Sequence, residues 1–112
     1  MSSDFDYPKL IGTLSAEERI SFYESLAHNL TISVRCIWSE DSFTDSQKIE
    51  GMKCVNEIMH RVVKIPAALR SGLDIWSEDE TWETIKHWVS LSPEISGYVW
   101  WAIKASYESC RR

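Results

Sequence analysis

Glycine and proline are scarce in this sequence, with four glycines and three prolines among 112 residues. Because both residues interrupt helices, their scarcity favours long helical segments. The few glycines form none of the short motifs that cradle phosphate groups, bind dinucleotides or carry a nucleophilic serine. The sequence therefore lacks the signatures of nucleotide-binding proteins and serine hydrolases. We expect no cofactor, and a non-catalytic role is favoured.

Positive charge is also in short supply, since 12 lysines and arginines face 17 aspartates and glutamates for a net charge of −5. A domain with this balance repels phosphate backbones, and its basic residues do not form the stripe typical of nucleic-acid-binding proteins. Nucleic acid is therefore a disfavoured partner. A nucleic-acid-associated regulator is kept as an alternative, using the basic positions Arg61, Lys64, Arg111 and Arg112.

Paired cysteines and long apolar runs are missing too. The three cysteines, Cys36, Cys54 and Cys110, are odd in number and form no CxxC motif, which favours reduced thiols. The longest uninterrupted apolar run covers residues 98–103, whereas a membrane span needs about 20 residues. Residues 1–4 are polar and acidic, unlike a signal peptide. We therefore expect a cytoplasmic protein with no membrane interaction.

The sequence is rich in signals that begin helices. Capping boxes, in which a Ser or Thr hydroxyl and a Glu or Gln side chain bond to each other's backbone N–H, begin at Ser15, Thr44 and Ser77. Apolar residues then recur at steps of three and four. These patterns predict long helices over 16–38 and 45–65, joined as an antiparallel hairpin, and a shorter helix over 78–90.

Prolines and glycines mark the remaining boundaries. Ser92-Pro93-Glu94 predicts the start of a fourth helix over 93–109. Pro66 is expected to end the second helix, with a short helical turn after it that Gly72 closes. Gly51, inside the second helix, costs up to about 1 kcal/mol relative to alanine, so either the packing tolerates this cost or a neighbour comes close there.

The N-terminal residues 1–14 are expected to form an extended arm, because Pro8 and Gly12 disfavour a helix there. The rest of the chain supplies the four predicted helices with short links between them. The sequence therefore predicts an all-α, single-domain protein over residues 1–112, in which the long hairpin packs with the two shorter helices as a four-helix bundle.

The densest group of polar side chains lies on the second predicted helix: Asn56, Glu57, His60 and Arg61, with Arg35 of the first helix able to join it. A functional interpretation is acid–base chemistry, with Glu57 tuning the imidazole of His60. The alternative is structural, with these groups fixing how the helix docks. The structural interpretation is favoured, because such residues also pair simply as neighbours on a helix surface.

Two short patterns around this group suggest a relationship. The segments LTIxxR at residues 30–35 and NExxHRV at residues 56–62 resemble a pattern in small uncharacterised bacterial helical proteins. The resemblance covers residues 26–66. It implies a bacterial helical protein and no particular activity.

The three histidines raise the alternative of a metal-dependent helical-bundle enzyme that uses His28, His60 and His87, each with a glutamate about one turn before it. The spacing Glu57-x-x-His60 is that of di-iron carboxylate bundles. Such a site needs a second copy of this motif and two further inward glutamates, and the sequence has one copy. No metal site is therefore assigned.

Tryptophan is abundant, with six in the chain. The last two predicted helices carry the aromatic residues Trp82, Trp88, Tyr98, Trp100 and Trp101. Trp100 and Trp101 point about 100° apart on a helix, so they cannot both face the centre of one small core. They either flank the core or form a partner-binding surface, since tryptophan and tyrosine are enriched at interfaces. We therefore predict a protein-interaction or regulatory module that binds a protein partner or a second copy of itself.

Overall fold

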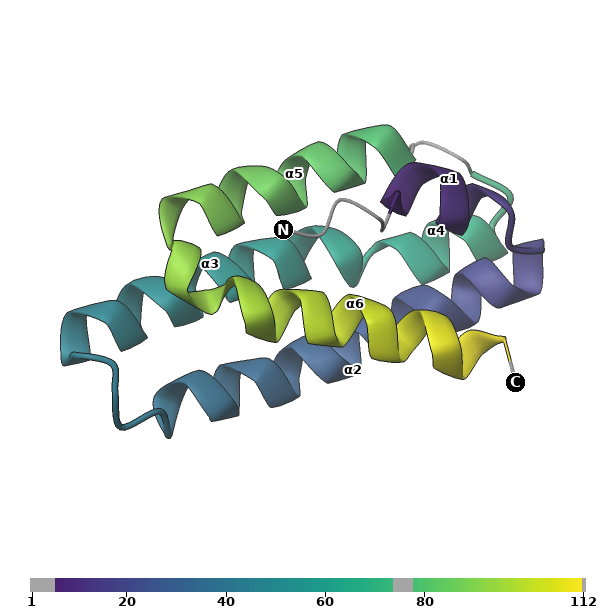
Figure 1. Cartoon of the computed structure of the whole chain (residues 1–112). Coiled ribbons are helices and arrows are strands. Elements are labelled where there is room, and N and C mark those ends of the chain that lie inside the picture. The colour runs from purple at the N-terminus through teal and green to yellow at the C-terminus, as the bar shows by residue number, and fades with distance from the viewer. Residues whose placement is uncertain (1–5, 74–77, 112) are drawn as a thin grey trace.

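A computed structural model of the chain describes residues 6–73 and 78–111 (Figure 1). All regular structure in these two ranges is helical, as the sequence predicted. The elements are α1 (Tyr7–Gly12), α2 (Ala16–Trp38), α3 (Asp45–Val62), α4 (Ile65–Arg70), α5 (Glu78–Leu91), the 3₁₀ helix η1 (Pro93–Ile95) and α6 (Ser96–Cys110).

The four long helices pack side by side in alternating directions. In Figure 1, α2 runs antiparallel to both α3 and α6, and α5 returns antiparallel to α3. The α2 helix packs against α3, α4 and α6, whereas α5 packs against α3 and α1. The expected hairpin with two shorter helices packed on it is therefore confirmed. Its buried core draws side chains from all of these helices, among them Tyr7, Phe22, Leu26, Val55, Ile58, Ile85, Val99 and Ile103.

Two of the three capping boxes lie within the described residues, and both are formed. The backbone N–H of Ser15 donates to Glu18 Oε1 at 2.8 Å, and that of Glu18 donates to Ser15 Oγ at 3.1 Å. The reciprocal distances at Thr44 and Gln47 are 2.8 and 3.1 Å. The third, at Ser77, lies outside the described residues.

The extended arm expected over residues 1–14 is wrong for its second half, which forms α1. Asp6 caps this helix by accepting the N–H of Lys9 at 3.4 Å. Pro8 is tolerated because it lies in the first turn, where its missing N–H has no partner in any case. Tyr7 and Ile11 are completely buried, so tertiary packing stabilises a helix too short to persist alone. Residues 1–5 of the arm lie outside the described residues.

The prediction that one helix runs over 45–65 and ends at Pro66 is wrong in detail. The helix ends at Val62, and Pro66 lies in the first turn of α4. Proline starts a helix here for the same reason as in α1. The predicted closure by Gly72 is confirmed: its φ is +76°, and the next residue, Leu73, donates its N–H back to the Ala68 carbonyl at 2.9 Å.

The predicted fourth helix begins as the 3₁₀ turn η1, and α6 follows from Ser96. This turn lies against Gly51 of α3. A Cβ atom at Gly51 would be only 2.6 Å from Ile95 Cγ2, so of the two explanations for this glycine the structure supports the close neighbour. Ile37 of α2 lies beside the same position. The contact at Gly51 therefore packs α2, α3 and η1 together at one end of the bundle.

Candidate functional site

The polar group on α3 is spread over the surface. The side chains of Arg35, Asn56, Glu57 and His60 are exposed. Arg61 is half-buried and turns toward α5, where its Nε donates to Thr81 Oγ1 at 3.4 Å and its Nη2 lies 3.9 Å from Glu80 Oε1. Arg61 therefore links α3 to α5, in agreement with a structural role for this residue.

The three histidines lie on three different helices. His28 on α2, His60 on α3 and His87 on α5 are all exposed. Within residues 6–73 and 78–111, no group of three histidine, cysteine, aspartate or glutamate side chains is arranged to hold a metal ion. The contacts that His60 and His87 make are local: His60 Nε2 is 3.4 Å from Lys64 Nζ, and the ring of His87 packs edge-on against Trp88.

Most of the aromatic residues of α5 and α6 pack against the core. Trp82 stacks on Tyr7 with ring centroids 5.0 Å apart and an interplanar angle of 6°. Trp100 lies 5.4 Å from Trp82, and Trp88 is also half-buried against the core. Trp82 and Trp100 therefore help to join α1, α5 and α6, and all three indoles are partly buried.

A hydrogen-bonded network that the sequence did not reveal lies under α1. The hydroxyls of Tyr7 and Tyr23 are 2.8 Å apart, Tyr23 donates to Glu78 Oε2 at 3.0 Å, and Arg19 pairs with the same carboxylate at 2.9 Å. Burial raises the pKa of both tyrosines, which keeps them neutral. The network ties α1, α2 and α5 together, and because its two tyrosines are buried and its ion pair is mostly buried we assign it a structural role.

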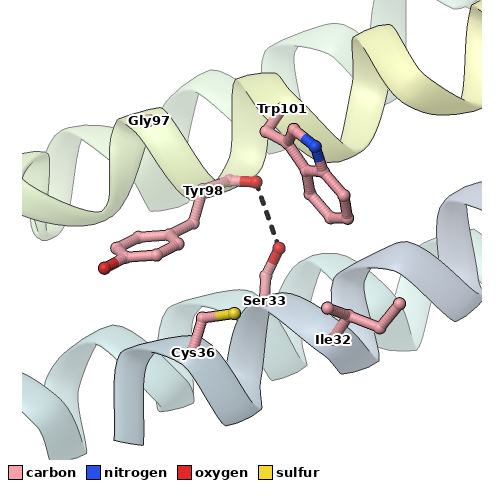
Figure 2. A pocket seen from close by; sticks show the side chains of 6 residues that line it. All are labelled: Ile32, Ser33, Cys36, Gly97, Tyr98 and Trp101. Carbon is pink, nitrogen blue, oxygen red and sulfur yellow. Dashed lines mark hydrogen bonds between the residues drawn. The ribbon is translucent and has the colours of Figure 1, made fainter. Parts of the chain in front are cut away.

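Trp101 differs from the other three tryptophans of α5 and α6, since 45% of its surface is exposed. It stands at the rim of an apolar groove of about 480 Å³ between α2 and α6. The lining residues, Ile32, Ser33 and Cys36 of α2 and Gly97, Tyr98 and Trp101 of α6, are shown in Figure 2. The rings of Tyr98 and Trp101 extend from α6 toward Cys36 and Ile32 of α2, which form the opposite wall (Figure 2). We call this feature the α2–α6 groove.

Hydrogen bonds between the two helices hold the walls of the groove in place. Ser33 Oγ, which is buried, donates to the Tyr98 carbonyl at 3.1 Å (Figure 2). Further along, Asn29 Nδ2 donates to Ser106 Oγ at 2.9 Å. At Gly97 no heavy atom lies within 4 Å of where a Cβ would be. Gly97 therefore lines the α2–α6 groove at a point where a side chain would have space.

A negative charge lies next to the groove, at the hydroxyl of its lining residue Tyr98. Tyr98 donates its hydroxyl to Glu40 Oε1 at 2.5 Å, and Ser42 Oγ donates to Glu40 Oε2 at 2.7 Å. These bonds lower the pKa of Glu40, and the same carboxylate raises the pKa of Tyr98 to about 12. At neutral pH Glu40 is therefore ionised and Tyr98 is neutral. The Tyr98 ring is also packed edge-on against Phe43, with centroids 6.3 Å apart.

The α2 wall is the part of the groove that the sequence did not single out. Ile32 and Cys36 are one turn apart and lie off the main apolar stripe of α2, so their spacing is the signal for a second apolar face. Gly97 had no signal at all, because an absent side chain matters only once the neighbouring helix is placed. Trp38 is 63% exposed and lies under Lys48, whose Nζ is 5.7 Å from the ring. Trp38 does not line the groove.

No family model matches this chain, and neither a curated protein nor a solved structure shows significant similarity to it. The resemblance of residues 26–66 to small bacterial helical proteins therefore stays a prediction. Among the described helices, none combines the length and the apolar character needed to cross a membrane.

Proposed function

We propose that this protein is a non-catalytic interaction module that binds a protein partner in the α2–α6 groove. The observation that carries the proposal is the exposure of Trp101 at the rim of an open, apolar groove. Tryptophan is enriched among the residues that dominate binding energy at protein interfaces, particularly where it borders a pocket. The expected cytoplasmic location and bacterial origin belong to the same proposal.

The aromatic surface expected from the sequence becomes smaller and better defined. Tyr98 and Trp101 line the groove, whereas Trp82, Trp88 and Trp100 do not, so these two residues form the aromatic part of the proposed binding surface. The other wall comes from α2. The lining holds one thiol and two hydroxyls; the hydroxyl of Ser33 is donated to a backbone carbonyl and that of Tyr98 to Glu40. An arrangement of this kind supports binding rather than acid–base chemistry.

Affinity capture from the native host, with the bound proteins identified by mass spectrometry, tests the proposal. The immobilised baits are the wild type, Trp101→Ala, which removes the exposed indole, and Gly97→Leu, which fills the groove. Trp38→Ala is the matched control, because it removes an even more exposed indole that does not line the groove.

We expect at least one partner that the wild type and Trp38→Ala retain and that both groove variants lose. If every captured protein binds the four baits equally, the groove is not the binding surface. Gly97→Leu should not unfold the chain, because its Cβ enters open space and leucine favours a helix more than glycine does. Circular dichroism of each bait checks this.

A further inference from the structure

The walls of the α2–α6 groove restrict what can bind there. Both walls are α-helices, in which the backbone N–H and C=O groups bond within the helix. An extended peptide would find no backbone partners on them, and it would have to leave its own groups in water or unsatisfied. A helical segment brings its backbone bonds with it and needs only to insert apolar side chains. The groove therefore suits a helix.

The size of the groove argues against a second copy of the chain. Six residues line it, whereas a stable protein–protein interface takes roughly 20–30 residues from each side. Its volume of about 480 Å³ lies in the lower part of the range of small ligand sites, roughly 300–1,000 Å³. A net charge of −5 further opposes self-association. A short segment that inserts one or two apolar side chains fits this space better than a folded surface does.

Charge indicates the character of that segment. The carboxylate of Glu40 is held next to the groove by two side-chain hydroxyls, and the whole chain is acidic. Arg35 and Lys104 are exposed on the same two helices, and neither lines the groove. A fixed carboxylate on an acidic protein attracts a basic partner at long range and pairs with it in the complex.

Building on the proposed function, we infer that the α2–α6 groove binds a short basic amphipathic helix of a partner protein, with its apolar side chains between Trp101 and Ile32 and a lysine or arginine against Glu40.

Three labelled synthetic peptides test this inference by fluorescence anisotropy with the full-length protein. All three carry the same leucine stripe at helical spacing. The first has lysines on its polar face, the second has glutamates in their place, and the third is the lysine peptide with a central proline that prevents a helix. The protein variants are Gly97→Leu, Glu40→Gln and the control Glu17→Gln, which removes an exposed charge at the far end of α2.

The lysine peptide should bind best, and Gly97→Leu should weaken it at least about tenfold, because an anchoring side chain is lost. Glu40→Gln should weaken it about two- to fivefold, since the amide still accepts the Tyr98 hydroxyl but the charge is gone. Glu17→Gln should leave the affinity unchanged.

Equal binding of the glutamate or the proline peptide overturns the inference, and so does an affinity that Gly97→Leu leaves intact. A dimer in sedimentation that Gly97→Leu dissociates also overturns it, because the occupant would then be a second copy. These outcomes are separable from failure of the proposed function. If capture from the host depends on the groove but the lysine peptide is not preferred, the interaction role stands and only the class of partner is wrong.

Discussion

The contact between Gly51 and Ile95 allows one substitution to be followed quantitatively. In Gly51→Ala the new Cβ would lie 2.6 Å from Ile95 Cγ2, a distance that such atoms do not tolerate. Ile95 is completely buried and its Cγ2 is attached directly to Cβ, so it cannot move aside as a long side chain would. Overpacking of this kind costs about 1–3 kcal/mol, whereas alanine in place of glycine in a helix contributes about 1 kcal/mol. We therefore expect a net loss of about 1 kcal/mol in the free energy of unfolding.

Denaturant unfolding followed by circular dichroism measures this loss of free energy. In a thermal scan the same loss should lower Tm by about 4 °C in a chain of this size. Gly97→Ala is the matched control. It makes the same chemical change in a helix, but no heavy atom lies within 4 Å of the new Cβ. It should raise the free energy of unfolding by up to about 1 kcal/mol.

A double-mutant cycle identifies the atom responsible. Because Ile95→Ala removes the clashing Cγ2, Gly51→Ala should stabilise the protein in that background although it destabilises the wild type. The reasoning is refuted if Gly51→Ala and Gly97→Ala stabilise the wild type equally. It is also refuted if the effect of Gly51→Ala is the same with and without Ile95.

Further predictions concern α1, the helix caps and the pH dependence of stability. Tyr7→Phe should lower the free energy of unfolding by about 1–2 kcal/mol in denaturant titration, because it removes a buried hydroxyl that bonds to Tyr23. The raised pKa values of Tyr7 and Tyr23 mean that the folded state holds their protons more tightly than the unfolded state. The stability that these two tyrosines contribute should therefore be constant below their ordinary pKa of about 10 and fall as pH rises above it, less steeply in Tyr23→Phe; a pH series of unfolding curves measures this. Ser15→Ala and Thr44→Ala should each cost about 1 kcal/mol in the same assay, since each opens a capping box. Gly72→Ala should cost about 1–2 kcal/mol, because its φ of +76° is strained for any residue with a Cβ.

The helices of this protein follow largely from local chemistry that the sequence displays. The capping boxes at Ser15 and Thr44 start α2 and α3 because a hydroxyl and an acid or amide three residues later satisfy each other's backbone. The apolar stripes then tell which face is buried. Local rules were insufficient at α1 and α4. Both helices are short, and burial of Tyr7 and Ile65 in the tertiary structure stabilises them.

The candidate site was predictable only in part. The sequence drew attention to Tyr98 and Trp101 among the aromatic residues, but it could not separate Trp101 from Trp82 and Trp100, which have similar neighbours along the chain. The difference arises from α1, since Tyr7 stacks on Trp82 and Trp100 packs beside it. The polar residues of α3 attracted attention by their density, yet Asn56, Glu57 and His60 are exposed.

The amino-acid sequence by itself determined that this is an all-α protein, where its long helices start and which faces they bury, because caps and hydrophobic periodicity act within one or two helical turns. Only the tertiary structure decided that an apolar groove exists. Its walls, Ile32 and Cys36 on one side and Gly97 and Trp101 on the other, come from α2 and α6, which are far apart along the chain. They face each other because the bundle packs these two helices antiparallel (Figure 1). Gly97 has no side chain, and a Cβ atom at this position would meet no other part of the structure within 4 Å.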